Sequence, residues 1–170
     1  EIPLPPPGVP GMRLYRALTK AARDAGVRVI SGSWVVDKVV EGGRLAALVV
    51  GEAGRRVEFR ARSFVFAPGG FESGALAVDS YGAISETALG LPLTASTSTG
   101  LIHGEFWGSD QALFGVGVRV DPAMRVLDAG GTPVFANLYA AGGVLAGAWR
   151  WREKSGEGIA AASALVAADQ

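Results

Sequence analysis

The last third of the chain constrains the fold most, because the residues at its turns are mostly glycine and alanine and carry little side-chain bulk. Residues 137–147 read NLYAAGGVLAG, a short apolar strand that stops at a glycine pair. Residues 155–168 read SGEGIAAASALVAA, a glycine-rich helix start followed by an alanine-rich helix. Such a helix start presents backbone N–H groups and the positive pole of the helix dipole. This strand–turn–helix unit therefore suits an electron-rich ring or a phosphate.

A second glycine pair follows another apolar run, because residues 64–71 read FVFAPGGF. We expect residues 64–67 and 138–141 to be buried central strands that neighbour each other in a parallel sheet. A chain that leaves the carboxyl end of such a strand passes close to any ligand bound there. Taken alone, the pair at residues 69–70 fits an ordinary exit turn equally well. Its combination with the carboxyl-terminal unit favours a ligand site.

The order of the expected elements fits an α/β or an α+β fold. We expect the α/β fold, part of a Rossmann-like domain with a β-meander and an irregular insertion. A helix is expected over residues 12–25, where apolar residues recur on one face and Gly26 follows as a cap. Alternating or apolar runs predict strands at residues 27–30, 34–40, 45–50, 56–60 and 116–120. Residues 150–154 are expected to form a charged loop before the last helix. We divide the chain into a proline-rich lead-in (1–10), the helix, meander and strand (11–70), an inserted cap-like segment (71–115), and the return strands with the terminal helix (116–170).

Composition excludes several kinds of function. The net charge is zero, so no electrostatic footprint for nucleic acid is present. The chain has no cysteine, which excludes disulfides, thiolate chemistry and iron–sulfur ligation by this chain, and one histidine, so no metal site is expected. No apolar run approaches the roughly 20 residues of a membrane span. The first residues, EIPLPPPGVPG, lack an initiating Met and signal-peptide features, so we expect a fragment or a processed piece.

Few polar residues stand out as catalytic candidates. His103, in the segment HGEFWG, is a weak candidate for an acid or base, although a lone loop histidine is more often structural. Arg150 and Arg152 suit phosphate or carboxylate, although a surface or partner-facing loop explains them more simply. The other charged candidates are more simply solvated side chains: Glu72, Glu86 and Arg119.

In order along the chain, several motifs resemble the carboxyl-terminal half of the B subunit of anaerobic glycerol-3-phosphate dehydrogenase. They are GVPGMRLYRAL, the meander, RARSFVFAPGGFESGAL, LGLPL, HGEFWG, FGVGVRVDPAMR, NLYAAGGVLAG and GEGIAAASALVAA. That subunit is similar in turn to flavoproteins of the fumarate reductase and succinate dehydrogenase type. The resemblance covers nearly the whole chain.

The resemblance implies a flavin-linked complex that oxidises glycerol 3-phosphate to dihydroxyacetone phosphate and passes electrons to quinone. It implies as partners a catalytic flavoprotein subunit and an iron–sulfur subunit that anchors the complex in the membrane. The chain would then be cytoplasmic, held at the inner membrane through these partners. An exposed sheet edge would also permit homo-oligomers.

The resemblance also implies a flavin, FAD or FMN, and assigns its contacts to the glycine-rich segments. The turn after residue 67 would run near the dinucleotide, the segment 139–143 along the ribityl and phosphate groups, and the last helix start at the pyrimidine edge of the ring. The implied cofactor-binding residues are Pro68, Gly69, Gly70, Gly142, Gly143, Gly156, Gly158 and Ile159.

Two departures from the flavoprotein pattern leave a second hypothesis open. Related flavoproteins carry an acidic residue where this chain has Gly143, so one anchor for a flavin hydroxyl is absent. They also open with a G-x-G-x-x-G turn, whereas the only similar run here is the carboxyl-terminal SGEGIAA. We therefore expect the isolated chain to retain little or no flavin. The alternative to a flavin-linked oxidoreductase subunit is a non-catalytic accessory module that supports a partner flavoprotein.

Overall fold

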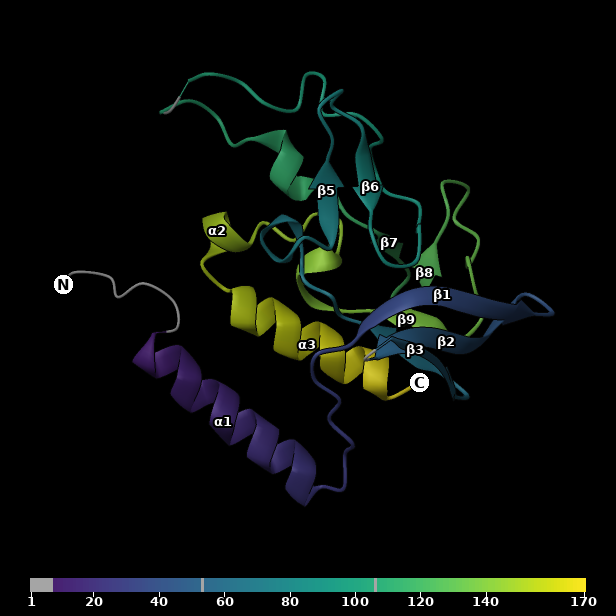
Figure 1. Cartoon of the computed structure of the whole chain (residues 1–170). Coiled ribbons are helices and arrows are strands. Elements are labelled where there is room, and N and C mark those ends of the chain that lie inside the picture. The colour runs from purple at the N-terminus through teal and green to yellow at the C-terminus, as the bar shows by residue number, and fades with distance from the viewer. Residues whose placement is uncertain (1–7, 53, 106) are drawn as a thin grey trace. The chain divides into compact units, whose positions relative to one another are not determined.

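The computed structural model describes residues 8–52, 54–105 and 107–170 and shows a mixed α/β chain (Figure 1). The chain divides into two compact units, of which the first ends at Ser33 and the second spans Trp34–Gln170. The small sheets and the helices confirm that the chain mixes α and β structure. Among the described strands only one pair is parallel, so a larger Rossmann-like sheet stays a prediction.

The first unit contains one helix, α1 (Val9–Asp24). The helix begins earlier than expected because Pro10 sits in its first turn, where proline needs no hydrogen-bond partner. The rest of the proline-rich lead-in, residues 1–7, lies outside the described residues. Gly26 follows the helix with a φ of +81°, and its N–H donates to the Arg23 carbonyl at 2.9 Å.

The strand expected at residues 27–30 is wrong, because this segment has no regular secondary structure. A strand is stabilised by the ladder it shares with a partner, and an apolar run does not by itself supply one.

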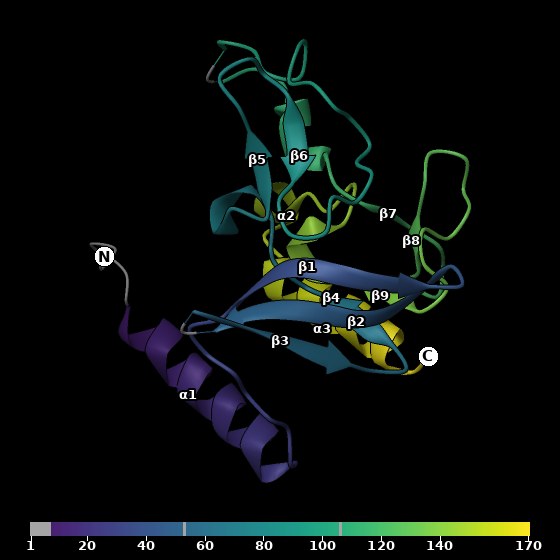
Figure 2. The same cartoon turned by 45° about the vertical axis from the view of Figure 1, so that its right-hand side comes forward.

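The second unit opens with the predicted meander, β1 (Trp34–Glu41), β2 (Arg44–Glu52) and β3 (Arg55–Arg60), which lie side by side in that order (Figure 2). Gly42 and Gly43 form the first hairpin turn with φ of +55° and +75°, a conformation that favours glycine.

The two apolar runs form the predicted parallel pair, β4 (Phe64–Phe66) with β9 (Leu138–Ala140). Phe64 lies opposite Leu138, and Phe66 lies opposite Ala140. Ala140 and Leu138 are fully buried, whereas Val65 is 47% exposed. The expectation that both strands are buried on both faces is therefore wrong for β4, since one face of this two-stranded sheet is open at Val65.

Short elements fill the middle of the chain: η1 (Phe71–Ser73), β5 (Leu76–Val78), β6 (Ile84–Glu86), η2 (Ala112–Gly115), β7 (Arg119–Val120) and β8 (Val126–Leu127). The predicted strand 116–120 is thus shorter than expected. Val118, at its centre, makes only an isolated parallel bridge to Leu145. Val118 belongs to the hydrophobic core, which also contains Leu76, Leu89 and Leu91 of the middle segment and Leu138 of β9.

The chain ends with η3 (Gly142–Val144), α2 (Arg150–Glu153) and α3 (Gly156–Ala168). The charged loop expected at residues 150–154 is wrong, because most of it forms the single helical turn α2. That turn stops at Lys154, whose φ of +51° is incompatible with further helix. Within the described part of the chain, no helix combines the length and apolar character needed to cross a membrane.

Candidate functional site

The parallel pair brings two glycine turns to one edge of the molecule. The first glycine turn (residues 68–70) follows β4, and the second glycine turn (Gly142 and Gly143, within η3) follows β9. The turns touch, because a Cβ built on Gly70 would lie 2.9 Å from the Gly143 carbonyl oxygen. Because β4 and β9 are parallel, the turns that follow them lie at the same end of the pair, which explains this contact.

One glycine in each turn is required by its backbone. Gly69 and Gly142 have φ of +96° and +77°, where other residues are strained. The Ser73 hydroxyl lies 2.8 Å from the Pro68 carbonyl and 2.9 Å from the Gly70 carbonyl, and it closes the first glycine turn. A Cβ at Gly69 would overlap that hydroxyl.

The second glycine turn is fastened to α3 through a buried serine. The Gly142 N–H donates to Ser163 Oγ at 2.9 Å, and Ser163 Oγ donates to the Ile159 carbonyl at 2.6 Å. Ser163 is only 7% exposed. The first turn of α3 therefore keeps a fixed position relative to this glycine turn.

The Arg150 guanidinium covers both glycine turns. A Cβ at Gly70 would lie 2.7 Å from its Nη2, and a Cβ at Gly143 would lie 2.8 Å from its Nη1 and 2.9 Å from its Cζ. The aliphatic stem of Arg150 continues toward α3, 3.8 Å from where a Cβ of Gly156 would be. Three of the predicted cofactor-binding glycines thus surround one arginine.

Glu72 of η1 holds that arginine in place. Arg150 Nη2 donates to Glu72 Oε2 at 2.6 Å, and the side chains are 31% and 64% exposed, respectively. The Arg150 hydrogen bond, assisted by the backbone N–H of Glu72, lowers the pKa of the Glu72 carboxyl below its ordinary value. This charge pair lies 78 residues apart in sequence, so no local pattern indicates it.

The start of α3 lacks a side-chain cap, and its first turn carries one acidic residue, Glu157. Ser155 precedes the helix, but its side chain makes no capping hydrogen bond and lies 3.3 Å from Glu153 Oε2. A Cβ at Gly158 would have only Ser155 Cβ near it, at 3.8 Å. Tight helix packing, the alternative explanation for this glycine, finds no support at Gly158. Ile159 is half-buried, and its N–H donates to the Ser155 carbonyl at 2.8 Å.

The structure shows His103 bonded within its own loop. His103 Nε2 lies 2.7 Å from the Ser109 carbonyl oxygen, and Nδ1 lies 3.3 Å from Gln111 Nε2. The Gln111 Oε1 also accepts the His103 backbone N–H at 2.8 Å. These bonds favour a structural role, and a catalytic role stays a prediction.

The other charged candidates have structural partners. Arg152 pairs with Asp110 at 3.1 Å, and Arg119 donates to the Ala129 carbonyl at 3.1 Å. The expectation that Glu86 is a solvated charge is wrong, because the residue is 5% exposed and its carboxylate accepts backbone N–H bonds inside its own turn. In the described residues no group of three or more His, Asp or Glu side chains is placed to hold a metal ion.

Two adjoining glycine turns beside an uncapped helix start suit a dinucleotide-binding type of protein. In agreement, the chain belongs to the FAD binding domain family, whose model matches residues 2–159. Curated relatives that it resembles include the B subunit of anaerobic glycerol-3-phosphate dehydrogenase, marked as probable in Halobacterium salinarum. That archaeal protein is 33% identical over 98% of this chain and 39% of its own length. The Pasteurella multocida protein is 29% identical over 100% of this chain and 40% of its own length. The Yersinia enterocolitica protein is 29% identical over 99% of this chain and 39% of its own length.

The chain therefore spans about two fifths of the length of the curated relatives it matches. No solved structure matches it. The family and the relatives confirm the resemblance found in the sequence, and among the two flavins considered they favour FAD. The individual cofactor-binding residues stay predictions.

Proposed function

We propose that this chain forms part of the FAD site of a subunit of a glycerol-3-phosphate dehydrogenase complex. The observation that carries the proposal is the parallel β4–β9 pair, which brings both glycine turns to one edge. Ser163 then ties the second turn to the start of α3. Membership of the FAD binding domain family supports the choice of cofactor.

The start of α3 fits an electron-rich edge of the flavin ring. No side-chain hydrogen bond caps this helix, and the space beside Gly158 is open. The N–H groups of its first turn, with the positive pole of the helix dipole, would stabilise partial negative charge on the ring. Bound FAD would supply the acceptor for the electrons removed from the substrate.

The two glycine turns fit the cofactor less directly. The Arg150 guanidinium fills the space beside Gly70 and Gly143. Any flavin contact at these turns would therefore be made to their other backbone atoms or to Arg150 itself. We assign the ring contact to Gly158 and Ile159 and leave the turns a supporting role.

The relatives' names motivate the finer assignment. Glycerol 3-phosphate would be the substrate of the whole complex, and quinone, which the resemblance implies, would receive the electrons. A catalytic flavoprotein subunit and an iron–sulfur anchor subunit would be the partners, which would hold this cytoplasmic chain at the inner membrane.

A non-catalytic accessory role is the second candidate. It is favoured by His103, whose ring is bonded inside its own loop, and by the absence of an acidic residue at Gly143. In this case the chain would hold no reacting group and would support a partner flavoprotein.

Flavin occupancy of the full-length protein, purified with its partner subunits, separates these candidates. We expect FAD in this subunit after the subunits are separated, and its visible absorption should bleach when glycerol 3-phosphate is added to the complex. Release of all the flavin with a partner subunit would favour the accessory role. Bleaching by an unrelated substrate alone would overturn the glycerol 3-phosphate assignment.

A further inference from the structure

Arg150 is the part of the site that the flavin assignment leaves unexplained. Its guanidinium lies against both glycine turns, although Gly70 and Gly143 do not have the positive φ that requires glycine at Gly69 and Gly142. A side chain at either position would collide with the guanidinium. At Gly143 the nearest atoms to such a side chain all belong to Arg150, whereas at Gly70 the Gly143 carbonyl oxygen would also be in the way.

We propose that Arg150 is a positioning residue: with Glu72 it clasps the two glycine turns together and so fixes the start of α3 for the flavin. This inference rests on the proposed function. The clasp consists of the Arg150–Glu72 ion pair and the seat that Gly70 and Gly143 provide for the guanidinium.

The packing of the Arg150 guanidinium, rather than the exposure of the pair, distinguishes it from an ordinary surface ion pair. The Arg150 and Glu72 side chains are 31% and 64% exposed at 2.6 Å, and those of Arg152 and Asp110 are 65% and 30% exposed at 3.1 Å. Exposed pairs contribute little to stability because water screens them. The seat restricts the Arg150 guanidinium on two sides, so loss of this side chain also removes packing.

The clasp is connected to the helix start by two routes. The Arg150 stem lies 3.8 Å from the Cβ position of Gly156, at the first residue of α3. The second glycine turn, on which the guanidinium rests, is bonded to Ser163 of the same helix. Movement of Arg150 would therefore loosen the geometry that presents Gly158 to the cofactor.

A double-mutant cycle in the full-length protein tests the seat without any flavin. The three atoms nearest to a Cβ at Gly143 all belong to Arg150. Gly143→Ala should lower the melting temperature by about 4 °C in the parent and by less than about 1 °C in the Arg150→Ala background. Equal losses in both backgrounds would overturn the seat.

Gly70→Ala provides the matched control, because its Cβ would also lie 2.9 Å from the Gly143 carbonyl oxygen. The decrease in melting temperature that Gly70→Ala causes should therefore persist in the Arg150→Ala background. If Gly143→Ala alone does not fold, folding of the Gly143→Ala, Arg150→Ala double variant supports the seat, and failure of both overturns it.

FAD affinity and the visible circular dichroism of the bound flavin test the positioning role. Arg150→Met should raise the FAD dissociation constant about tenfold and change the flavin band, while Arg152→Met leaves both within about twofold. Compared with Arg150→Met, Arg150→Lys should recover more of the melting temperature than of the FAD affinity, since lysine lacks the planar guanidinium group. Equal affinities for the Arg150 and Arg152 variants would overturn positioning and leave a structural clasp. A parent protein that binds no FAD would overturn the proposed function and positioning with it, while the melting cycle alone would still decide whether the seat exists.

Discussion

At the scale of single residues, the site uses glycine for three different physical reasons. Gly69 and Gly142 adopt positive φ, Gly70 and Gly143 leave room for a guanidinium, and Gly158 does neither. An exposed helical glycine without a packing neighbour costs about 1 kcal/mol relative to alanine. Its presence near the start of α3 agrees with the proposal that the flavin approaches the backbone there.

Substitution of Gly158 by valine separates cofactor contact from folding. The free energy of unfolding should change by no more than about 0.5 kcal/mol, because valine and glycine both form helix poorly. FAD occupancy in the full-length protein should fall by more than half, since a branched side chain blocks approach to the backbone. Occupancy and melting temperature are measured on the same preparations.

Ala164→Val is the matched control for Gly158→Val, because Ala164 is an exposed residue of the same helix. It should leave occupancy unchanged. If Gly158→Val lowers melting by several degrees at constant flavin per folded protein, Gly158 is structural and the ring assignment is wrong.

The clasp should make stability depend on pH through Glu72. Its folded-state pKa is lowered, chiefly by the Arg150 hydrogen bond, relative to 4.5 for the free group. A lowered pKa means that the contribution is complete above the unfolded pKa and is lost as the pH falls through the lower folded value. Melting temperatures of the parent and Glu72→Gln should therefore differ at pH 6 to 7, about two units above the free value, and converge at acid pH.

Glu58→Gln is a suitable comparison for this profile, because Glu58 pairs with Arg60 at 3.4 Å on an exposed face. Its melting temperature should follow the parent at every pH. A constant offset between the parent and Glu72→Gln down to pH values well below the folded pKa would contradict the role of the ionised carboxylate.

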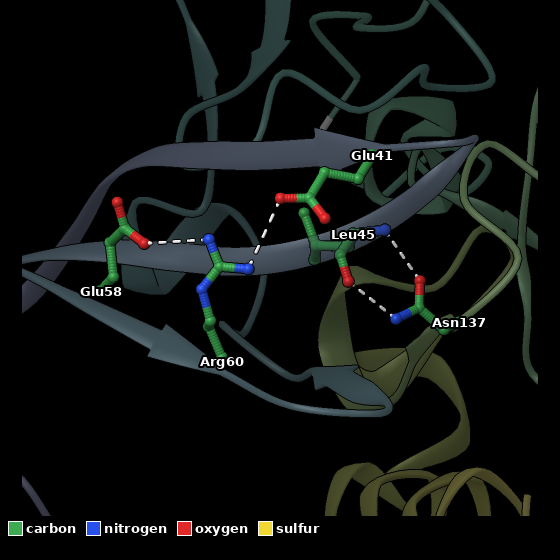
Figure 3. A network of polar contacts seen from close by, with 5 residues as sticks. All are labelled: Glu41, Leu45, Glu58, Arg60 and Asn137. Carbon is green, nitrogen blue, oxygen red and sulfur yellow. Dashed lines mark hydrogen bonds and ion pairs between the residues drawn. The ribbon is translucent and has the colours of Figure 1, made fainter.

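At the scale of elements, one buried asparagine joins the meander to the parallel pair. Asn137 precedes β9 and is 2% exposed. Its Oδ1 accepts the Leu45 N–H and its Nδ2 donates to the Leu45 carbonyl, both at 2.8 Å (Figure 3). Nδ2 also donates to the Arg62 carbonyl at 3.0 Å. The side chain thus acts as a short cross-strand link between segments far apart in sequence.

Asn137→Ala should destabilise the protein strongly. It leaves the buried Leu45 N–H without its partner and opens a small cavity, for a combined loss of about 2–4 kcal/mol. Arg60→Gln removes the exposed contacts with Glu58 and Glu41 shown beside Asn137 in Figure 3 and should cost less than about 0.5 kcal/mol. Urea unfolding of both variants measures the difference, and similar losses would refute the link.

The sequence predicts elements best where local pattern and local partner coincide. The meander follows from its alternating and apolar runs and from the two-residue turn at Gly42 and Gly43. The β4–β9 pair follows from apolar runs that end in similar turns. Residues 27–30 have an apolar pattern but no described partner strand, so the same rule fails there. The helical turn α2 is missed because charged residues favour a loop and a helix turn equally.

The candidate site is predicted in part for the same reason. Glycine pairs after apolar strands indicate where the turns lie, and the parallel order places them together. The clasp depends on Glu72 and Arg150, which are brought together only by the tertiary fold. Each of these charged residues alone resembles an ordinary surface charge, so sequence patterns do not connect them.

At the scale of the whole molecule, the described strands supply only part of a dinucleotide site. The pyrophosphate cradle of such sites is the glycine-rich turn between the first strand and helix. The matching relatives extend far beyond this chain's share of about two fifths. We expect the 170-residue chain, produced alone, to retain less than a tenth of the flavin of the full-length protein, because its sequence does not contain that turn. Absorbance of both preparations checks this, and stoichiometric FAD in the chain alone would contradict it.

The open edge of β4 should drive association of the isolated chain. β4 pairs with β9 on one side, and no described strand pairs with its other edge. Val65 is 47% exposed at the centre of this strand. An unpaired edge with an apolar side chain favours pairing with a second chain. Sedimentation velocity should therefore show a larger species as the protein concentration rises.

A lysine at Val65 should oppose that pairing, because natural sheets protect open edges with inward or flanking charges. Val65→Lys should shift the chain toward monomer, with association weakened about tenfold or more. Leu165→Lys removes a side chain that is 67% exposed on α3 and leaves the β4 edge intact, so it should associate like the parent. If the leucine variant alone dissociates the chain, the apolar face of α3 is responsible, and a strict monomer in the parent contradicts edge pairing altogether.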